Sequence, residues 1–286
     1  MNKEERNQYL FENLQRHYDY VKGLGYDILY IAIQGSPNYE LDIYTDKYKS
    51  DVDTKAIILP SIDDFVKATP LVSTTIILPN DEHCDVKDIR VMFENFKKQN
   101  INFLEILFSE WNMINSDYAD EFLPILRSRE GIARMNFNQA LRCMAGMSKE
   151  KLNALEHPYP NCISDINQFG YSRKQLHHIV RMNDFIKKFV DGRTYAECLI
   201  PDDKEYLLNI KVNSMSLDEA RKLAIATDTE TYEIKQFASL PTDNINEDVV
   251  KLLEDVKYEI LKKKIIKEAL NGIDENNYLG GIYNVR

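Results

Sequence analysis

The sequence predicts an α+β protein, in which a small mixed sheet with flanking helices is followed by an all-helical domain. Segments with strand-like patterns are confined to the first 115 residues, whereas helical spacing of apolar residues dominates from residue 116 onward. The chain has 286 residues, 44% of them apolar, and only ten glycines, which disfavours an all-β sandwich with many tight turns. We therefore expect two domains, residues 1–115 and residues 116–286.

An amphipathic helix is expected at the start of the chain. Between residues 3 and 22 the apolar residues recur at three- and four-residue steps and so fall on one helical stripe: Tyr9, Leu10, Leu14, Tyr18 and Val21. Gly23 and Gly25 end this helix, since glycine readily adopts the backbone conformations that follow a helix C-terminus.

A strand, a tight turn and a second strand come next. Residues 28–33 form an apolar run that breaks at Gly35-Ser36. Ser36 can cap a short helix beginning at Pro37, whose missing N–H is not needed at that position. A polar loop then leads to a second apolar run, residues 52–59, with acidic residues at its start.

Further segments complete the predicted sheet domain. Residues 72–78 are rich in β-branched residues, which favours a strand, and residues 83–86 form another short strand after a turn. The spacing in residues 88–96 is helical, with Asp88 as its cap. Residues 100–108 form another apolar segment.

The second domain is expected to consist of helices alone. The periodicity predicts them over residues 120–129, 131–155, 172–190, 216–226 and 247–270. Clusters of Pro, Asp and Asn at residues 157–160 and 242–244 interrupt them. Residues 271–286, which contain three glycines, are expected to form a surface segment.

Charge and cysteine usage restrict the class of protein. A net charge of −10 argues against bulk attraction to duplex nucleic acid, although it leaves room for a local basic channel. The four cysteines, Cys84, Cys143, Cys162 and Cys198, are far apart, which disfavours a zinc knuckle or a disulfide framework. The charged N-terminus and the absence of an apolar stretch of roughly 20 residues predict a cytoplasmic protein with no membrane span.

Two acidic residues at the start of the second strand suggest a metal site. Residues two apart in a strand point the same way, so Asp51 and Asp53 would present their carboxylates on one side with Cα atoms about 7 Å apart. Mg²⁺ is usually held by one or two carboxylates together with substrate phosphates. An Asp-x-Asp is a weak signal by itself, because two solvated loop carboxylates give the same pattern.

The turn before these acids strengthens the metal interpretation. Glycine at residue 35 allows a phosphate to approach the backbone, and the amides after Gly35-Ser36 offer donors to an anion. A third acid on an adjoining strand could bind a second metal or take the proton from an incoming hydroxyl, and Asp85, Asp88 and Glu105 are the candidates. We favour Asp85, because Asp88 is better explained as a helix cap and Glu105 lies beyond the helix.

A basic face is predicted on the helix that starts near Ser172. Lys174, His178 and Arg181 are spaced at i, i+4 and i+7, so they share one side and can reach a triphosphate. The alternative is the solvated face of an amphipathic helix. His177 is expected to be a packing or surface residue, and Lys211 is a weaker candidate for the same cleft.

Taken together, these motifs resemble the DNA polymerase β-like nucleotidyltransferase superfamily, whose pattern is Gly-Ser, a spacer, Asp-x-Asp and a later third acid. The segments GSPNYELD, SDVDTKAI, DVKDIRVMFENFKKQNINFLEILFSE and FGYSRKQLHHIVR look like a bacterial and phage branch of predicted nucleotidyltransferases. That branch carries Lys, His and Arg at the spacing seen here. Relatives often have glycine where this chain has Glu40, and its spacer before Asp51 is a few residues longer.

The resemblance implies a small nucleotidyltransferase sheet with helices on one face and a helical domain that closes over the cleft. It further implies attack of an acceptor hydroxyl on the α-phosphate of a nucleoside triphosphate, with release of pyrophosphate. Asp51 and Asp53 would bind both of two Mg²⁺ ions, with Mn²⁺ as a substitute, and Asp85 would hold the catalytic one and orient the nucleophile. Tyr39 would line the nucleotide pocket, although an aromatic residue there can equally be core.

The partners are expected to be a nucleoside triphosphate and an acceptor hydroxyl. We favour a nucleic-acid 3′ end, of RNA or DNA, as the acceptor. A protein side chain or a small molecule is the alternative acceptor. A protein that binds nucleotides for regulation without turnover, and a helical interaction scaffold, are the alternative classes. The nucleotide, the oligomeric state and the pathway cannot be inferred from the sequence.

Overall fold

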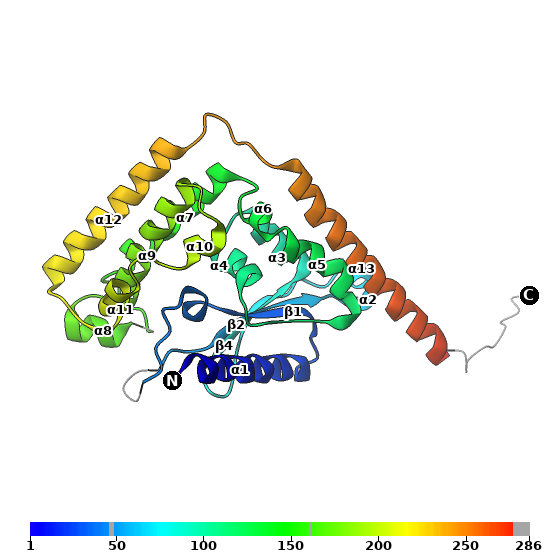
Figure 1. The fold of residues 1–286 in the computed structure, drawn as a ribbon. Coiled ribbons are helices and arrows are strands. Elements are labelled where there is room, and N and C mark those ends of the chain that lie inside the picture. Colours follow the sequence, from blue (N-terminus) through cyan, green and yellow to red (C-terminus); the bar gives the residue numbers. More distant parts are fainter. Residues whose placement is uncertain (46–48, 161, 277–286) are drawn as a thin grey trace, which may run out of the picture.

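Five strands form one mixed sheet (Figure 1). The computed structural model describes residues 1–45, 49–160 and 162–276. The spatial order of the strands is β3 (Ser73–Ile77), β4 (His83–Asp88), β2 (Asp53–Leu59), β1 (Asp27–Gln34) and β5 (Asn112–Ile114). β2 and β4 are parallel, and the other neighbours are antiparallel. This sheet, its flanking helices and the helical region that follows confirm the predicted α+β class.

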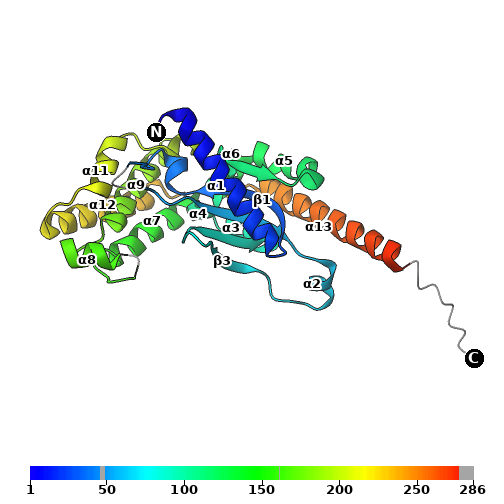
Figure 2. The ribbon, with the colours of Figure 1, turned by 90° about the horizontal axis from the view of Figure 1, so that it is seen from below.

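The first helix, α1 (Lys3–Gly23), lies across one face of the sheet (Figure 2). The predicted stripe is buried there against strand residues that point to the same face, in a core that includes Leu10, Leu14, Val21, Ile31, Ile33, Ala56, Ile58 and Trp111. The expectation of helices on one face only is therefore wrong. An amphipathic helix of this length must bury its apolar side, and the second face of the sheet provides the surface.

The opposite face of the sheet carries helices from the middle of the chain. They are α3 (Ile89–Lys97), α4 (Ile101–Leu104), η2 (Glu105–Phe108) and α5 (Ala119–Arg127). Tyr30 of β1 packs on Phe122 with ring centroids 5.0 Å apart, and its hydroxyl donates to the Ile106 carbonyl at 2.7 Å. Asp88 caps α3 by accepting from the Arg90 amide at 2.8 Å, which confirms its predicted role as a cap.

The helical region is organised around α9 (Arg173–Val190), and four other helices pack against it. These are α7 (Phe137–Asn153), α10 (Tyr195–Leu199), α11 (Lys204–Val212) and α12 (Leu217–Ala238). α8 (Ile163–Phe169) precedes α9. The single helix predicted over 131–155 is wrong: the chain is extended at Asn136, which separates α6 (Arg129–Ala133) from α7 and caps α7. The helix predicted to end at residue 226 continues to Ala238.

Three short elements lie in the first half of the chain. They are η1 (Ser36–Tyr39), α2 (Ile62–Val66) and η3 (Ser116–Tyr118). η1 follows β1 after Gly35, with Pro37 in its first turn as the sequence predicted. The prediction that Ser36 caps this helix is wrong, because Gly35 is at the N-cap position and no side chain forms a capping hydrogen bond.

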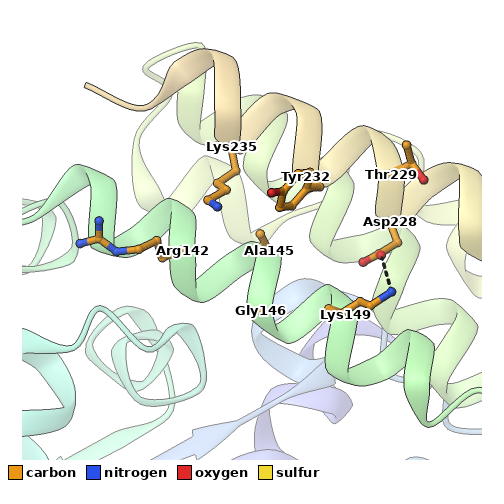
Figure 3. A pocket seen from close by; sticks show the side chains of 8 residues that line it. All are labelled: Arg142, Ala145, Gly146, Lys149, Asp228, Thr229, Tyr232 and Lys235. Carbon is orange, nitrogen blue, oxygen red and sulfur yellow. Dashed lines mark ion pairs between the residues drawn. The ribbon is translucent and has the colours of Figure 1, made fainter. Parts of the chain in front are cut away.

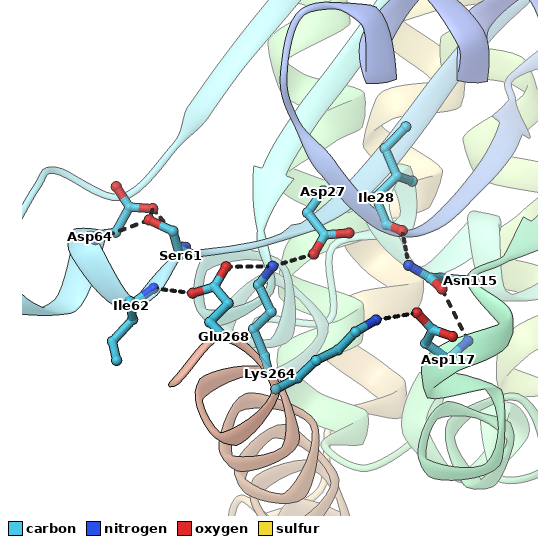
Figure 4. A network of polar contacts seen from close by, with 10 residues as sticks. Asp27, Ile28, Ser61, Ile62, Asp64, Asn115, Asp117, Lys264 and Glu268 are labelled. Atoms are coloured by element: carbon cyan, nitrogen blue, oxygen red, sulfur yellow. Dashed lines mark hydrogen bonds and ion pairs between the residues drawn. The ribbon is translucent and has the colours of Figure 1, made fainter. Parts of the chain in front are cut away.

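The last helix, α13 (Glu247–Asn276), returns to the sheet end of the molecule, whereas α12 forms the opposite outer edge (Figure 1). Figure 4 shows the polar contacts between α13 and residues near the sheet. Lys264 Nζ lies 2.5 Å from Asp27 and 2.8 Å from Glu268, and Glu268 accepts from the Ile62 amide at 2.5 Å. Lys267 pairs with Asp117 at 2.5 Å. Of the predicted surface segment 271–286, residues 271–276 continue α13, and residues 277–286 lie outside the described residues.

Two smaller predictions concern cysteines and membrane spans. All four cysteines are free thiols. Along the described parts of the chain, no helix combines the length and the apolar character that crossing a bilayer requires.

Candidate functional site

One cavity brings together most of the residues that the sequence singled out. Its volume is about 520 Å³, and it lies between the β1–β2 side of the sheet and the N-terminal half of α9. The predicted residues that line it are Gly35, Ser36, Tyr39, Asp51, Asp53, Lys174, His178 and Arg181. Residues separated by up to 146 positions in the sequence thus line one cavity. Strand alternation predicted which acids lie together, and helical spacing predicted which basic residues lie together, but neither pattern predicted that the two groups meet.

The Gly-Ser turn forms one wall of this cavity. Gly35 has φ 80° and ψ −142°, a conformation that glycine adopts far more readily than other residues. A Cβ atom at this position would have no neighbour within 4 Å, so the space beside the turn is open. The Gly35 amide donates to Glu105 Oε1 at 3.1 Å. Glycine is therefore required by the backbone here, and the open space allows a ligand to approach it.

The two acids lie on the same wall. Asp53 is the first residue of β2 and accepts from the His83 amide at 2.9 Å, whereas Asp51 lies in the segment before β2 and is exposed. Among the described residues, no group of three or more His, Cys, Asp or Glu is arranged to hold a metal ion. Two hard carboxylates beside a phosphate-sized space still fit Mg²⁺, which takes the remaining oxygens from phosphates and water.

Asp85 does not line the cavity with the other two acids. In the β2–β4 register it lies opposite Lys55, and its carboxylate is 3.4 Å from Lys55 Nζ and 2.7 Å from Lys87 Nζ. The Asp88 carboxylate caps α3 and forms an ion pair with Arg90 at 2.6 Å. Glu105, the third candidate, lines the cavity. The assignment of Asp85 as the third acid thus remains a prediction, and in this arrangement two ammonium groups neutralise its charge.

Arg181 projects from α9 as the most buried cation of the site. It is only 3% exposed, and its guanidinium lies 4.0 Å from the centroid of the Tyr39 ring. Its Nε and Nη1 atoms have no hydrogen-bond partner among the described residues. Burial lowers the pKa of Arg181, and the Glu105 carboxylate opposes this effect. Buried donors without partners are rare, because their desolvation is costly, so these atoms point to an anionic ligand.

The neighbouring residues of α9 differ from one another in charge. Lys174 is exposed and cationic, whereas burial, followed by the nearby His177 and Arg181, lowers the pKa of His178 well below its ordinary value. His178 is therefore neutral near pH 7 and can contribute a hydrogen bond but no charge. Within the predicted trio, Arg181 and Lys174 supply the positive charge.

The structure adds residues that the sequence did not place in the site. His177 lines the cavity, is 5% exposed, and its Nε2 has no hydrogen-bond partner among the described residues. Burial, followed by Arg181 and Lys211, lowers its pKa to about 3. His177 is buried, as expected of a packing residue, and it also lines the cavity. Its spacing from Lys174 (i+3) and Arg181 (i+4) was the available signal.

Lys211 and Lys55 also line the cavity. Lys211 Nζ donates to the Leu41 carbonyl at 3.0 Å, which ties α11 to the loop after η1. Lys55 lies two residues after Asp53 on the same side of β2 and is buried. The strand alternation that aligned Asp51 with Asp53 could also have identified Lys55.

Glu40 has a backbone conformation that favours glycine. It ends η1 with φ 55° and ψ 35°, in the left-handed region. Non-glycine residues pay a steric penalty there. The Glu40 side chain forms an ion pair with Lys204 at the start of α11, so the residue connects the segment after the Gly-Ser turn to the helical region.

A second cavity of about 520 Å³ lies between α7 and α12 (Figure 3). Its charges are largely neutralised: Arg142 pairs with Asp243 at 2.8 Å, and Lys149 lies 3.8 Å from Asp228. Asp228 is the one carboxylate among the described residues that line it. Without a carboxylate pair or a glycine turn, this cavity lacks the features that the sequence predicted for the functional site.

Comparison with known proteins adds little. No family model and no curated protein matches the chain. Among solved structures, the chain is similar to a nucleotidyltransferase-like protein from Exiguobacterium sibiricum 255-15. The two are 13% identical, the match covers 88% of this chain and 80% of that chain, and the TM-score is 0.29. A likeness this low establishes neither a shared fold nor a shared activity, so the function has to be inferred from the cavity.

Proposed function

We propose that the chain is a Mg²⁺-dependent nucleotidyltransferase that needs no template. It moves a nucleoside monophosphate from a nucleoside triphosphate to an acceptor hydroxyl and releases pyrophosphate. The observation that carries this proposal is the cavity of about 520 Å³, in which a glycine turn, two carboxylates and a buried guanidinium meet. Its volume is within the range of about 300–1,000 Å³ common for small-ligand sites.

The phosphates bind between the Gly-Ser turn and α9. The space beside Gly35 admits a phosphate, and the unpartnered Nε and Nη1 of Arg181 donate to its oxygens. Lys174 adds a charge at the exposed rim, while neutral His178 adds a hydrogen bond. The Tyr39 ring helps to position the Arg181 guanidinium, because a cation is attracted to the face of an aromatic ring.

Asp51 and Asp53 would hold the metal ion. When bound, Mg²⁺ supplies positive charge at the attacking and the leaving oxygens of the displacement. Asp51 is exposed and Asp53 keeps one carboxylate oxygen free of the His83 amide bond, so both can offer ligands to it. Positioning and charge neutralisation are the main contributions that a protein makes to phosphoryl-group chemistry.

The acceptor in this proposal is a nucleic-acid 3′ hydroxyl. With a net charge of −10, the chain has no general attraction for long duplexes, whereas a single 3′ end needs contact only at the cavity mouth. Protein side chains and small molecules are the competing acceptors, and one assay separates them.

The test is an incubation with each of four α-labelled nucleoside triphosphates, in the presence of Mg²⁺ or of EDTA. Total cellular RNA, single-stranded DNA, a protein extract and a small-molecule extract serve as separate acceptors. We expect Mg²⁺-dependent label on the 3′ ends of nucleic acid, together with stoichiometric pyrophosphate. Label on protein or on a small molecule would correct the acceptor and leave the reaction intact.

The competing classes give different results in the same experiment. A regulatory nucleotide-binding protein would bind a triphosphate with Mg²⁺ but release no pyrophosphate with any acceptor. A helical scaffold would show no metal-dependent binding of triphosphate in calorimetry. Either result would overturn the proposed function.

A further inference from the structure

Glu105 is a buried carboxylate beside the position proposed for the phosphates. It begins η2, is 2% exposed, and lines the cavity. Its Oε1 accepts from the Gly35 amide at 3.1 Å, while its Oε2 has no hydrogen-bond partner among the described residues. Buried carboxylate oxygens are normally hydrogen-bonded, so this atom awaits either a proton or a ligand.

The groups around Glu105 do not neutralise its charge completely. Arg181 of α9 faces it, but among the described residues no ion pair joins the two side chains. Tyr195 of α10 also faces it, with a buried hydroxyl that has no partner among those residues. The turn between β1 and η1 contributes the uncharged Gly35 amide, which donates to Glu105 Oε1. Three further cations of the cavity are engaged elsewhere: Lys55 with Asp85, Arg173 with Asp165, and Lys211 with the Leu41 carbonyl. Lys174 also lines the cavity but is exposed to solvent.

Burial therefore dominates the ionisation of this carboxyl. It raises the pKa of Glu105 to about 7, whereas Arg181 and the Gly35 amide act in the opposite direction and offset it only in part. Both protonation states are thus populated near neutrality. A bound phosphate would add negative charge close to the same atoms, which favours the neutral form of the carboxyl.

From this geometry we infer that Glu105 takes up one proton when phosphates bind between Gly35 and Arg181, an inference that rests on the proposed function. The proton comes from solvent and is carried on the carboxyl group. The carboxyl can then donate to a phosphate oxygen instead of repelling it, and Arg181 is left to interact with the phosphate alone. Glu105 is in this way a residue that makes triphosphate binding depend on pH.

The sign of the pH effect follows from linkage. The carboxyl is protonated more in the complex than in the free protein, so binding is strongest below pH 7 and weakens as the pH rises above it. For uptake of one proton, the affinity of the wild type should fall about tenfold per pH unit above the free-state pKa. Glu105→Gln keeps an oxygen for the Gly35 amide and an N–H donor for phosphate, so its affinity should lack this dependence.

The experiment measures binding of inorganic triphosphate with excess Mg²⁺ by calorimetry from pH 6 to pH 8.5. This probe contains no base and reports on the phosphate position alone. Triphosphate itself titrates over this pH range, and this affects the affinity of both proteins equally. The ratio of the wild-type and Glu105→Gln affinities at each pH therefore reports on Glu105 alone. We expect equal affinities near pH 6 and about tenfold tighter binding by the variant at pH 8. Wild type measured in two buffers with different ionisation enthalpies should show uptake of up to one proton, and this readout does not depend on the variant.

The possible outcomes separate the inference from the proposed function. Parallel pH profiles and no proton uptake would overturn the inference, while binding itself would still support a triphosphate site. Weaker binding by Glu105→Gln at every pH, with an unchanged melting temperature, would also overturn it. If neither protein binds triphosphate and no label is transferred in the acceptor assay, the proposed function fails as well. If label is transferred without measurable binding of the inorganic probe, only the inference fails.

Discussion

A guanidinium that is buried without a paired carboxylate destabilises a folded chain, because its desolvation is not repaid. Arg181 is in this position: it stacks on Tyr39, faces Glu105 without an ion pair, and leaves two nitrogens without partners among the described residues. A residue of this kind is expected where a ligand supplies the missing interactions. At the scale of single residues, Arg181 is thus better evidence for an anion site than the exposed Lys174.

Arg181→Met tests this interpretation. Methionine fills a similar volume without charge, so the melting temperature should stay the same or rise, since replacing a buried charge by a packed apolar group is often neutral or stabilising. Triphosphate affinity should fall about 10- to 100-fold, the loss of one or two charge-assisted hydrogen bonds. Calorimetry and thermal unfolding of the same sample check both. Lys187→Met, at an exposed position of the same helix, is the matched control and should change neither.

The acids give a second residue-scale prediction. Asp51→Asn and Asp53→Asn should each reduce Mg²⁺-dependent transfer at least about a hundredfold, because the amide is a poorer ligand for the metal that stabilises the displacement. Neither residue is in the core, so the melting temperature should change by less than about 2 °C. Near-wild-type transfer by either variant would contradict the metal assignment.

Asp85→Asn decides the role of the third acid separately. If Asp85 binds the catalytic metal, its variant should lose transfer to the same extent as the other two. If it serves only as the countercharge of Lys55 and Lys87, transfer should fall little and stability should change instead.

At the scale of elements, the sequence predicted several segments with a clear stripe or cap, but not the break at Asn136 or the full length of α12. The helix before Gly23, both strands around the Gly-Ser turn and the capped helix after Asp88 were all identifiable, because each has a clear stripe or cap. The three-residue strand β5 and the short helices α8, α10 and α11 were not, since a few residues give no measurable period. β5 pairs with β1, and α10 and α11 pack against α9, so their positions depend on tertiary contacts.

In the site, too, local sequence patterns predicted some residues, whereas others are placed only by tertiary contacts. The spacing of Asp51 and Asp53, and that of Lys174, His178 and Arg181, predicted which side chains share a wall of the cavity. His177 was not predicted to line the cavity, although its spacing from Lys174 and Arg181 places it beside them on α9. Periodicity could not place Glu105, which reaches Gly35 across 70 positions of the sequence.

The turn between β1 and the acids provides an element-scale prediction. Because Glu40 has a φ of 55°, Glu40→Gly should be more stable than Glu40→Ala by about 1 kcal/mol, the reverse of the ranking within a helix. Both variants lose the ion pair with Lys204 equally, so the difference between their free energies of unfolding reports on the backbone conformation alone. Urea unfolding measures it. At Lys187, an exposed position of α9, the matched pair Lys187→Ala and Lys187→Gly should show the ordinary order, with alanine more stable.

At the scale of the whole molecule, one hydrophobic core joins the sheet to the helical region. It runs from Tyr30 of β1 through Phe122 and Ile106 to buried residues of α7, α9, α12 and α13. Phe108 of η2 stacks on Tyr195 of α10 with ring centroids 4.8 Å apart. The boundary predicted at residues 115 and 116 remains a prediction. This core indicates that the two parts depend on each other for stability, and α13 crosses back to the sheet end.

The continuous core predicts a single cooperative unfolding transition. Trp111, the one tryptophan of the chain, is 5% exposed and lies in the core between the sheet and α1, so its fluorescence reports on the sheet end. Far-UV circular dichroism reports chiefly on the helices. We expect both probes to give the same midpoint in urea. Leu176→Ala, which creates a cavity in α9 at the opposite end, should cost about 2–5 kcal/mol and shift both midpoints equally. A shift seen by dichroism alone would mean that the helical region unfolds independently of the sheet, and the two predicted domains would then be separate folding units as well.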